Sequence, residues 1–176
     1  MARISYEAKL SEIFSDALLD EIGSGFGLLM LEAKCESPIE TIMLLALYKA
    51  FRFESTAPFA FLGNDPDTKF ANSYGLLQLY SQVQIADYRV DFLLKMPLED
   101  GGSVNFVIEC DGHEFHERTK EQAARDRARD RKLQSLGYTV FRFTGSEIWR
   151  SSEKCAYEIM GAFSRKVTEV VSGEKE

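Results

Sequence analysis

The chain has 176 residues, of which 45% are apolar, so it is long enough for one domain with a substantial core and too short for two. No run of 18 apolar residues occurs, and the first ten residues carry charges where a signal peptide would be apolar, so we expect a cytoplasmic protein that does not enter a membrane. The three cysteines form no C-x-x-C pair, which argues against a disulfide framework and a four-ligand zinc site.

The formal net charge of -7 argues against a nucleic-acid partner, because phosphate contacts are usually made by a surplus of lysine and arginine. The charges are unevenly distributed, however. Residues 1–116 hold 8 basic and 18 acidic side chains, whereas residues 117–132 hold 7 basic and 4 acidic ones. The second segment is therefore a local basic patch, and it keeps DNA binding open.

A helical extension is predicted at the N-terminus. Apolar side chains recur near helical spacing over residues 4–22, and Gly23 ends the pattern. We divide the chain into this extension, residues 1–36, and one compact domain, residues 37–176.

The compact domain begins with a helix-start signal, the sequence SPIE at positions 37–40. Ser37 suits the N-cap, Pro38 suits the first helical position, and the Glu40 carboxylate is expected to accept a hydrogen bond from the Ser37 amide. The helix is predicted to continue to about Phe51. The prolines and glycines of residues 53–75 indicate an irregular segment after it.

From Leu77 onward the apolar pattern changes to every second residue, which predicts strands. Gln82 and Gln84 fall on the polar face of the first strand, where we expect them to be solvated; the alternative is that they align the substrate. The predicted strands are 77–85, 88–95, 104–111 and 138–143, and the predicted helices are 119–136, ended by Gly137, and 153–171. This order predicts an α/β fold in which a mixed sheet of about four strands is flanked by helices.

Two carboxylates end the otherwise apolar third strand. Glu109 and Asp111 are two residues apart, so both side chains point to one face of the sheet, where like charges repel. A hard cation such as Mg²⁺ would resolve the conflict, and Asp91 in the neighbouring strand supplies another carboxylate for it. In the structural alternative, Asp111 merely begins a turn, and Asp91 pairs with Arg89 or Arg142.

Four short segments together resemble the very-short-patch-repair-like branch of the PD-(D/E)XK nuclease superfamily. They are SPIE at 37–40, VDF at 90–92, IECDGH at 108–113 and RF at 142–143. The resemblance implies a restriction-endonuclease-like fold and cleavage of DNA with Mg²⁺ or Mn²⁺. It also implies that Asp91 and Glu109 are metal ligands, with the Cys110 carbonyl as a further one, and that Glu40 is the acidic residue of the first core helix.

The chain departs from the superfamily at one position. The pattern has a lysine two residues after the glutamate, and this sequence has Asp111, which cannot supply a positive charge. His113 and His116 can exchange protons near neutral pH and are therefore catalytic candidates. A second interpretation makes both histidines and Cys110 ligands of a transition metal.

The long predicted helix carries a stripe that is polar at its start and apolar at its end. Its members are spaced 4, 3, 4 and 3 apart: Gln122, Asp126, Arg129, Leu133 and Leu136. We predict that the polar end leans over the carboxylates, with Gln122 touching a phosphate or water. Alternatively, Asp126 and Arg129 form an i,i+3 ion pair. The candidate phosphate contacts of this helix are Lys120, Arg125 and Arg129.

These features predict a magnesium-dependent DNA endonuclease in which Asp91, Glu109, Asp111 and Glu40 form the acidic centre. The acidic total and the missing lysine also fit a second class, a nuclease-fold module that binds nucleic acid or a protein without turnover. Cleavage of RNA is a third interpretation.

Overall fold

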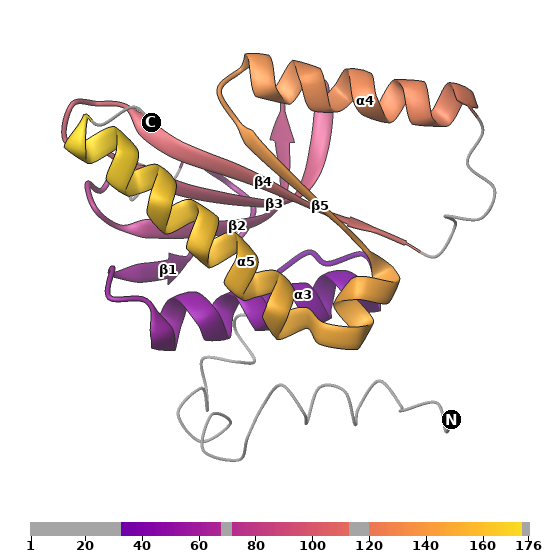
Figure 1. Cartoon of the computed structure of the whole chain (residues 1–176), viewed down its shortest axis with the longest axis horizontal. Helices are drawn as coiled ribbons and strands as arrows, with labels where there is room; N and C mark the ends of the chain where they lie inside the picture. The colour runs from indigo at the N-terminus through magenta and orange to yellow at the C-terminus, as the bar shows by residue number, and fades with distance from the viewer. Residues whose placement is uncertain (1–32, 68–71, 113–119, 174–176) are drawn as a thin grey trace.

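A computed structural model describes residues 33–67, 72–112 and 120–173. Figure 1 shows a central sheet with helices on both sides. The elements in chain order are α3 Pro38–Lys49, a π-helical turn η1 Ala50–Glu54, β1 Phe59–Phe61, β2 Leu77–Ile85, β3 Tyr88–Pro97, β4 Ser103–Asp111, α4 Lys120–Ser135, β5 Thr139–Thr144 and α5 Gly145–Ser172. Within these residues, no helix has the length and apolarity needed to cross a membrane.

The sheet is mixed, as predicted, and its strands lie in chain order from β1 to β5. The three central strands, β2 to β4, are antiparallel to one another, while β1 runs parallel to β2 and β5 runs parallel to β4. The parallel connection from β4 to β5 is made by α4, as expected for a crossover between parallel strands.

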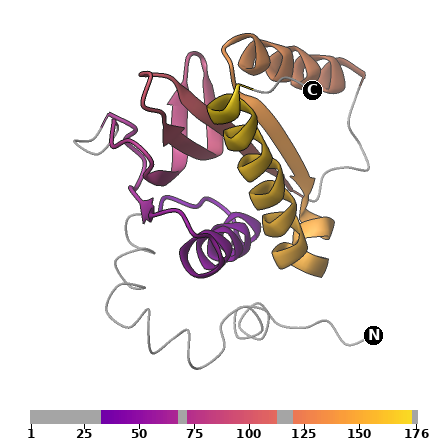
Figure 2. The same ribbon diagram turned by 60° about the vertical axis from the view of Figure 1, so that its left-hand side comes forward.

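Helices α3 and α5 cover one face of the sheet, and α4 lies on the other (Figures 1 and 2). The larger core cluster lies between the sheet and helices α3 and α5, and it includes Leu44, Phe106 and Ile159. A smaller cluster on the α4 side contains Val107 and Leu133. This three-layer α/β architecture is the one the sequence predicts.

Two differences from the sequence prediction have local causes, and one predicted helix is not tested. Strand β1 was not predicted, because its three residues fall within a segment rich in turn formers. Helix α5 begins at Gly145 rather than at 153, because the Thr144 side chain caps it and Glu147 bonds back to the Thr144 amide; the chain is kinked at Ser151. The predicted helix at residues 4–22 lies outside the described residues.

The alternation of side chains between the two sheet faces slips by one residue in the middle of β2 and β3. Tyr80 and Val83 are three residues apart, yet both belong to the core cluster on the α4 side. Val90 and Phe92 are two apart, yet they belong to different clusters. The slip occurs at Gln82, whose φ of 52° is left-handed, and at Asp91 opposite it. Both side chains are thereby turned out of the regular pleat.

Candidate active site at the centre of the sheet

A row of polar side chains crosses four strands at the slip. The register pairs Ser81 with Phe92 and Val83 with Val90, so Gln82 lies opposite Asp91. The pairing of Phe92 with Ile108 likewise places Asp91 opposite Glu109. Glu109 is paired with Arg142 on the far strand. The row Gln82, Asp91, Glu109 and Arg142 is flanked by apolar residues of both core clusters.

Asp91 is held in this row by the backbone of the next strand. Its Oδ2 accepts a hydrogen bond from the Cys110 amide at 2.7 Å. Burial raises the pKa of Asp91 to about 6, which the Cys110 hydrogen bond opposes and the neighbouring Glu40 carboxylate reinforces. The structural alternative for Asp91 does not hold here, because Arg89 pairs with Glu36 instead.

Glu109 is buried, with its side chain 6% exposed, and lies against a guanidinium from the opposite helix. Arg129 Nη2 donates to Glu109 Oε1 at 2.5 Å and to the Arg89 carbonyl at the same distance. Burial raises the pKa of Glu109 to about 8, and the nearby Asp91 carboxylate adds to the shift while Arg129 opposes it. The surroundings of Asp91 and Glu109 thus disfavour the ionised form of both carboxylates.

Asp111 occupies the same face as Glu109, as the two-residue spacing predicted. Arg142 Nη1 donates to Asp111 Oδ1 at 2.9 Å, and its Nη2 donates to Asp130 Oδ1 at 2.7 Å. Arg142 therefore links the end of β4 to helix α4 and is the partner of Asp111 rather than of Asp91. These contacts raise the pKa of Arg142 despite its burial, so it stays charged.

Glu40 reaches the row from α3 through Gln82. Gln82 Nε2 donates to Glu40 Oε2 at 2.7 Å and lies 3.5 Å from Asp91 Oδ1, so one amide bridges the two carboxylates. Glu40 also serves the helix start, where its carboxylate accepts from the Ser37 hydroxyl and from the Glu36 amide, both at 2.8 Å. The expected bond from the Ser37 amide is thus replaced by one from the preceding residue.

The surroundings of the two cysteines nearest the row, Cys35 and Cys110, disfavour the thiolate form. Burial raises the pKa of Cys35 to about 12, and burial together with Asp91 and Glu40 raises that of Cys110 as well. A thiol must lose its proton to bind a transition metal. This environment therefore weighs against Cys110 as a thiolate ligand and leaves its backbone carbonyl as the ligand the sequence suggested.

The remaining predicted site residues are only partly covered by the structure. His113 and His116 lie outside the described residues. Lys120 and Gln122 are in helix α4, but their side chains are not described, whereas Arg125 is exposed on that helix. Leu133 of the predicted stripe is fully buried, but Leu136 is 45% exposed, so the apolar contact of the stripe ends one turn early.

The family model REase_MTES_1575 matches residues 73–163, just over half of the chain. The chain belongs to this family. REase_MTES_1575 is restriction-endonuclease-like, which places the protein in a nuclease superfamily and agrees with the mixed sheet flanked by helices. The match includes Gln82, Asp91, Glu109, Arg129 and Arg142, and it begins after Glu40. No curated protein and no solved structure matches the chain.

The donor chemistry of the row fits a hard divalent cation. Asp91 and Glu109 present carboxylate oxygens from adjacent strands, and a cation would offset the burial and the charge repulsion that raise both pKa values. Among the described side chains, no three acidic, histidine or cysteine groups are gathered as a metal cluster. The metal ligands that the sequence suggested are the side chains of Asp91 and Glu109 and the backbone carbonyl of Cys110. Of these, Glu109 is paired with Arg129 in the structure.

Sequence reasoning missed the contacts that three residues make in this site. Gln82 was expected to be solvated, yet it is 9% exposed and bonded to Glu40, because the left-handed backbone turns it inward. Arg129 was predicted to belong to the stripe that leans over the carboxylates, with phosphate or Asp126 as its partner, and the structure gives it Glu109 as a partner. Arg142 was named in the RF segment of the family resemblance and as an alternative partner for Asp91, and the structure pairs it with Asp111 and Asp130. Buried acidic residues are rarely left unpaired, so each carboxylate near the strand end could have been expected to have a basic partner on a neighbouring element.

Proposed function

We propose that this protein is a metal-dependent endonuclease that hydrolyses phosphodiester bonds in DNA. The observation that carries the proposal is the position of the half-buried Asp91 beside the buried Glu109 on adjacent strands of a restriction-endonuclease-like domain. Perturbed carboxylate pKa values concentrate at functional sites, because folding tolerates such charge repulsion when a ligand requires it. We further propose that the chain belongs to the very-short-patch-repair-like branch suggested by its motifs.

Asp91, Glu109 and the Cys110 carbonyl would hold Mg²⁺ or Mn²⁺. Such a cation, when bound, polarises a phosphate and lowers the pKa of an attacking water. The protein positions these ligands in two ways. The Cys110 amide fixes Asp91 Oδ2, and the Gln82 amide ties Asp91 to Glu40, so that the first ligand has a defined orientation.

Arg129 is our candidate for the positive charge that the missing lysine supplies elsewhere in the superfamily. Its guanidinium already lies 2.5 Å from Glu109, and its side chain is 24% exposed, so it can turn toward a phosphate at the site. In this proposal Arg129 neutralises Glu109 before substrate binds and contacts the phosphate afterwards. His113 or His116 would donate a proton to the leaving oxygen.

One observation favours a second candidate function, a nucleic-acid-binding module without turnover. The Arg129 contact with Glu109 satisfies the buried charge without a metal. A protein that never binds metal could retain this ion pair for stability alone. The two candidates differ in whether cleavage occurs and whether it requires Glu109.

The test is nicking of supercoiled plasmid, with single-stranded DNA and RNA as parallel substrates, in Mg²⁺, Mn²⁺ or EDTA. We expect metal-dependent nicking that is lost in Glu109→Gln and Asp91→Asn. Glu99→Gln is the matched control, because it makes the same chemical change at a residue in the turn between β3 and β4. DNA binding without cleavage in either metal would favour the second candidate, and cleavage of RNA alone would correct the substrate.

A further inference from the structure

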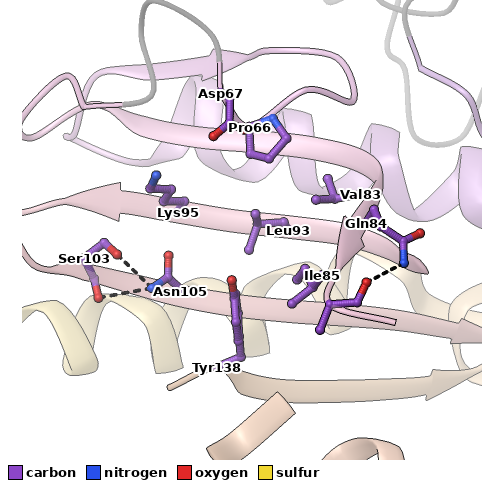
Figure 3. Close-up of a pocket in the computed structure, with 11 residues that line it drawn as sticks. Pro66, Asp67, Val83, Gln84, Ile85, Leu93, Lys95, Ser103, Asn105 and Tyr138 are labelled. Carbon is purple, nitrogen blue, oxygen red and sulfur yellow. Dashed lines mark hydrogen bonds between the residues drawn. The ribbon is translucent and has the colours of Figure 1, made fainter. Parts of the chain in front are cut away.

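The α4 side of the molecule has two surface features outside the carboxylate row, and they differ in charge. One is a hollow of about 370 Å³ beside β2, β3 and β4, shown in Figure 3. Its lining combines Lys95 with Asp67, and its apolar members Val83 and Leu93 are buried in the core, so it offers a ligand no charge of one sign and no open apolar surface. The other feature is the side of α4 that faces away from the sheet.

Helix α4 turns its aspartates toward the sheet. Leu133 is fully buried and marks the inner side of the helix. Asp126 and Asp130 lie on that side and are half-buried, and Asp130 is paired with Arg142. Glu121 is exposed, but it lies in the first turn, ahead of the basic residues. The outer side of α4 from position 124 onward therefore has no acidic residue.

Four basic side chains occupy this outer side. Residues four or seven apart share one side of a helix, so Arg127 lies in line with Arg131, and Arg125 lies in line with Lys132. All four are exposed, and within the part of the chain that the structure describes none of them has an ion-pair or hydrogen-bond partner. The strip between the two lines consists of small exposed residues, Ala124, Ala128 and Ser135. The outer side is thus a flat strip with a row of positive charge along each edge.

We propose that the outer side of α4 binds a segment of duplex DNA, with the helix lying in the major groove. The inference rests on the proposed function in one respect, that nucleic acid is the substrate. The major groove is about 12 Å wide and admits an α-helix, whose diameter with side chains is about 10–12 Å. The small residues would face the base pairs, and each row of cations would contact the phosphates of one strand.

The charge and position of α4 both suit such a partner. The chain has a formal net charge of -7 and repels a polyanion over most of its surface, so unpaired cations gathered on one helix are a localised attraction. Helix α4 lies along the outside of the domain, on the opposite face of the sheet from α3 and α5 (Figures 1 and 2). Its outer side is therefore open to a duplex.

This surface is separate from the carboxylate row. Arg129 contacts Glu109 from the inner side of α4, and the strip lies across the helix from that contact, about 10 Å away. A duplex in this position is a segment next to the one that is cut, and it is held without metal. Because phosphate contacts carry no sequence information, binding here should not depend on sequence.

The test is fluorescence anisotropy of a labelled DNA duplex mixed with the full chain in EDTA, over a series of salt concentrations. Each phosphate contact contributes about 0.9 to the slope of log affinity against log salt, so the double variant Arg127→Gln, Arg131→Gln should lower that slope by about 2 and weaken binding at least tenfold at about 0.1 M salt. Arg125→Gln combined with Lys132→Gln should have a similar effect. Thermal midpoints should change little, because these side chains have no partner in the described part of the chain.

The matched control is Arg150→Gln combined with Lys154→Gln, which removes two exposed basic residues from α5 on the other face of the sheet. It changes the net charge equally and should leave the affinity and the salt slope unchanged. An equal loss in this control, or no loss in the two α4 variants, would overturn the inference.

Two further probes test whether the helix occupies a groove. Double-stranded RNA has a deep, narrow major groove that side chains cannot read, and a single strand has no groove, so both should bind more weakly than a DNA duplex of the same sequence. Equal affinity for all three would show a general attraction for polyanions and overturn the inference. Cleavage has no part in a measurement made in EDTA, so this inference and the proposed function fail independently.

Discussion

Arg129 of α4 places its Nη2 2.5 Å from the Oε1 of Glu109, across the boundary between helix and sheet. The same nitrogen donates to the Arg89 carbonyl, and the guanidinium lies 5.7 Å from the Tyr88 ring centroid. Arg129 is thus attached to both strands that carry the central carboxylates. Arg129 places a positive charge beside Glu109, whereas the superfamily pattern has a lysine on the strand itself, at the position of Asp111.

Replacing Arg129 with methionine should destabilise the fold mainly at high pH. Glu109 has a pKa of about 8, so at pH 6 it is largely protonated and gains little from Arg129. At pH 8.5 the unmodified chain gains from the ionised pair, whereas the variant must either keep Glu109 protonated or bury its charge without a partner. We expect a loss of about 2 kcal/mol in the free energy of unfolding at pH 8.5 and less at pH 6, measured by urea denaturation. Arg125→Met, at an exposed residue of α4, is the control. A pH-independent loss would contradict this account.

Glu109 should also make stability fall with rising pH when no divalent cation is present. Its pKa is raised in the folded state from 4.5 to about 8, so its contribution is complete below about pH 4.5 and is lost as the pH rises through 8. Relative to Glu109→Gln, the unmodified chain should therefore lose stability between pH 4.5 and 9, by up to about 1.4 kcal/mol per pH unit. Urea midpoints in EDTA measure this. Parallel curves for the two proteins would show that Glu109 titrates normally.

Divalent cations should reverse that loss. A ligand that binds only the folded state at 100 times its Kd adds about 2.7 kcal/mol, which corresponds to a rise in Tm on the order of 5 °C for a chain of this length. We expect Mn²⁺ or Mg²⁺ to raise the Tm of the unmodified chain, more at pH 8.5 than at pH 6, because the ligands must be ionised. Glu109→Gln and Asp91→Asn should not respond. The same rise in these variants would place the metal elsewhere.

Most of the fold could be predicted because the deciding signals are local. The two-residue apolar period locates β2, β3 and β4, and the left-handed Gly137 lies directly after α4, where the sequence placed the end of that helix. The early start of α5 was also encoded, since Thr144 and Glu147 have the spacing of a capping box. Strand β1 has no such signal, because three residues are too short to show a period.

The site could be predicted only as far as strand geometry reaches. Adjacent strands bring Asp91 and Glu109 together, and alternation puts Asp111 on the face of Glu109. The stripe on α4 predicts that its polar end lies over the carboxylates, but the choice of Glu109 as the partner of Arg129 depends on tertiary docking and has no local signature. The inward turn of Gln82 could not be foreseen either, because alternation predicts an outward side chain and only a left-handed backbone changes it.

That left-handed backbone gives a prediction whose sign is opposite to the usual one. In a regular strand glycine is less stable than alanine, because it loses more conformational freedom on folding. At Gln82, with φ of 52°, alanine must adopt a conformation that costs about 1–2 kcal/mol, which glycine avoids. Both substitutions remove the amide that joins Glu40 to Asp91, so the difference between them isolates the backbone.

We therefore expect Gln82→Gly to unfold at a higher urea concentration than Gln82→Ala, by about 1 kcal/mol in free energy. The same pair of substitutions at Gln84, two residues along the strand and outside the left-handed region, should show the reverse order. Both Gln82 variants should fall below the unmodified chain, since each leaves the buried Glu40 carboxylate with one donor fewer. If alanine is the more stable replacement at both positions, the strand is regular at Gln82. The slip that turns Val83 and Ile85 toward the α4 side of the sheet would then have to arise at another residue.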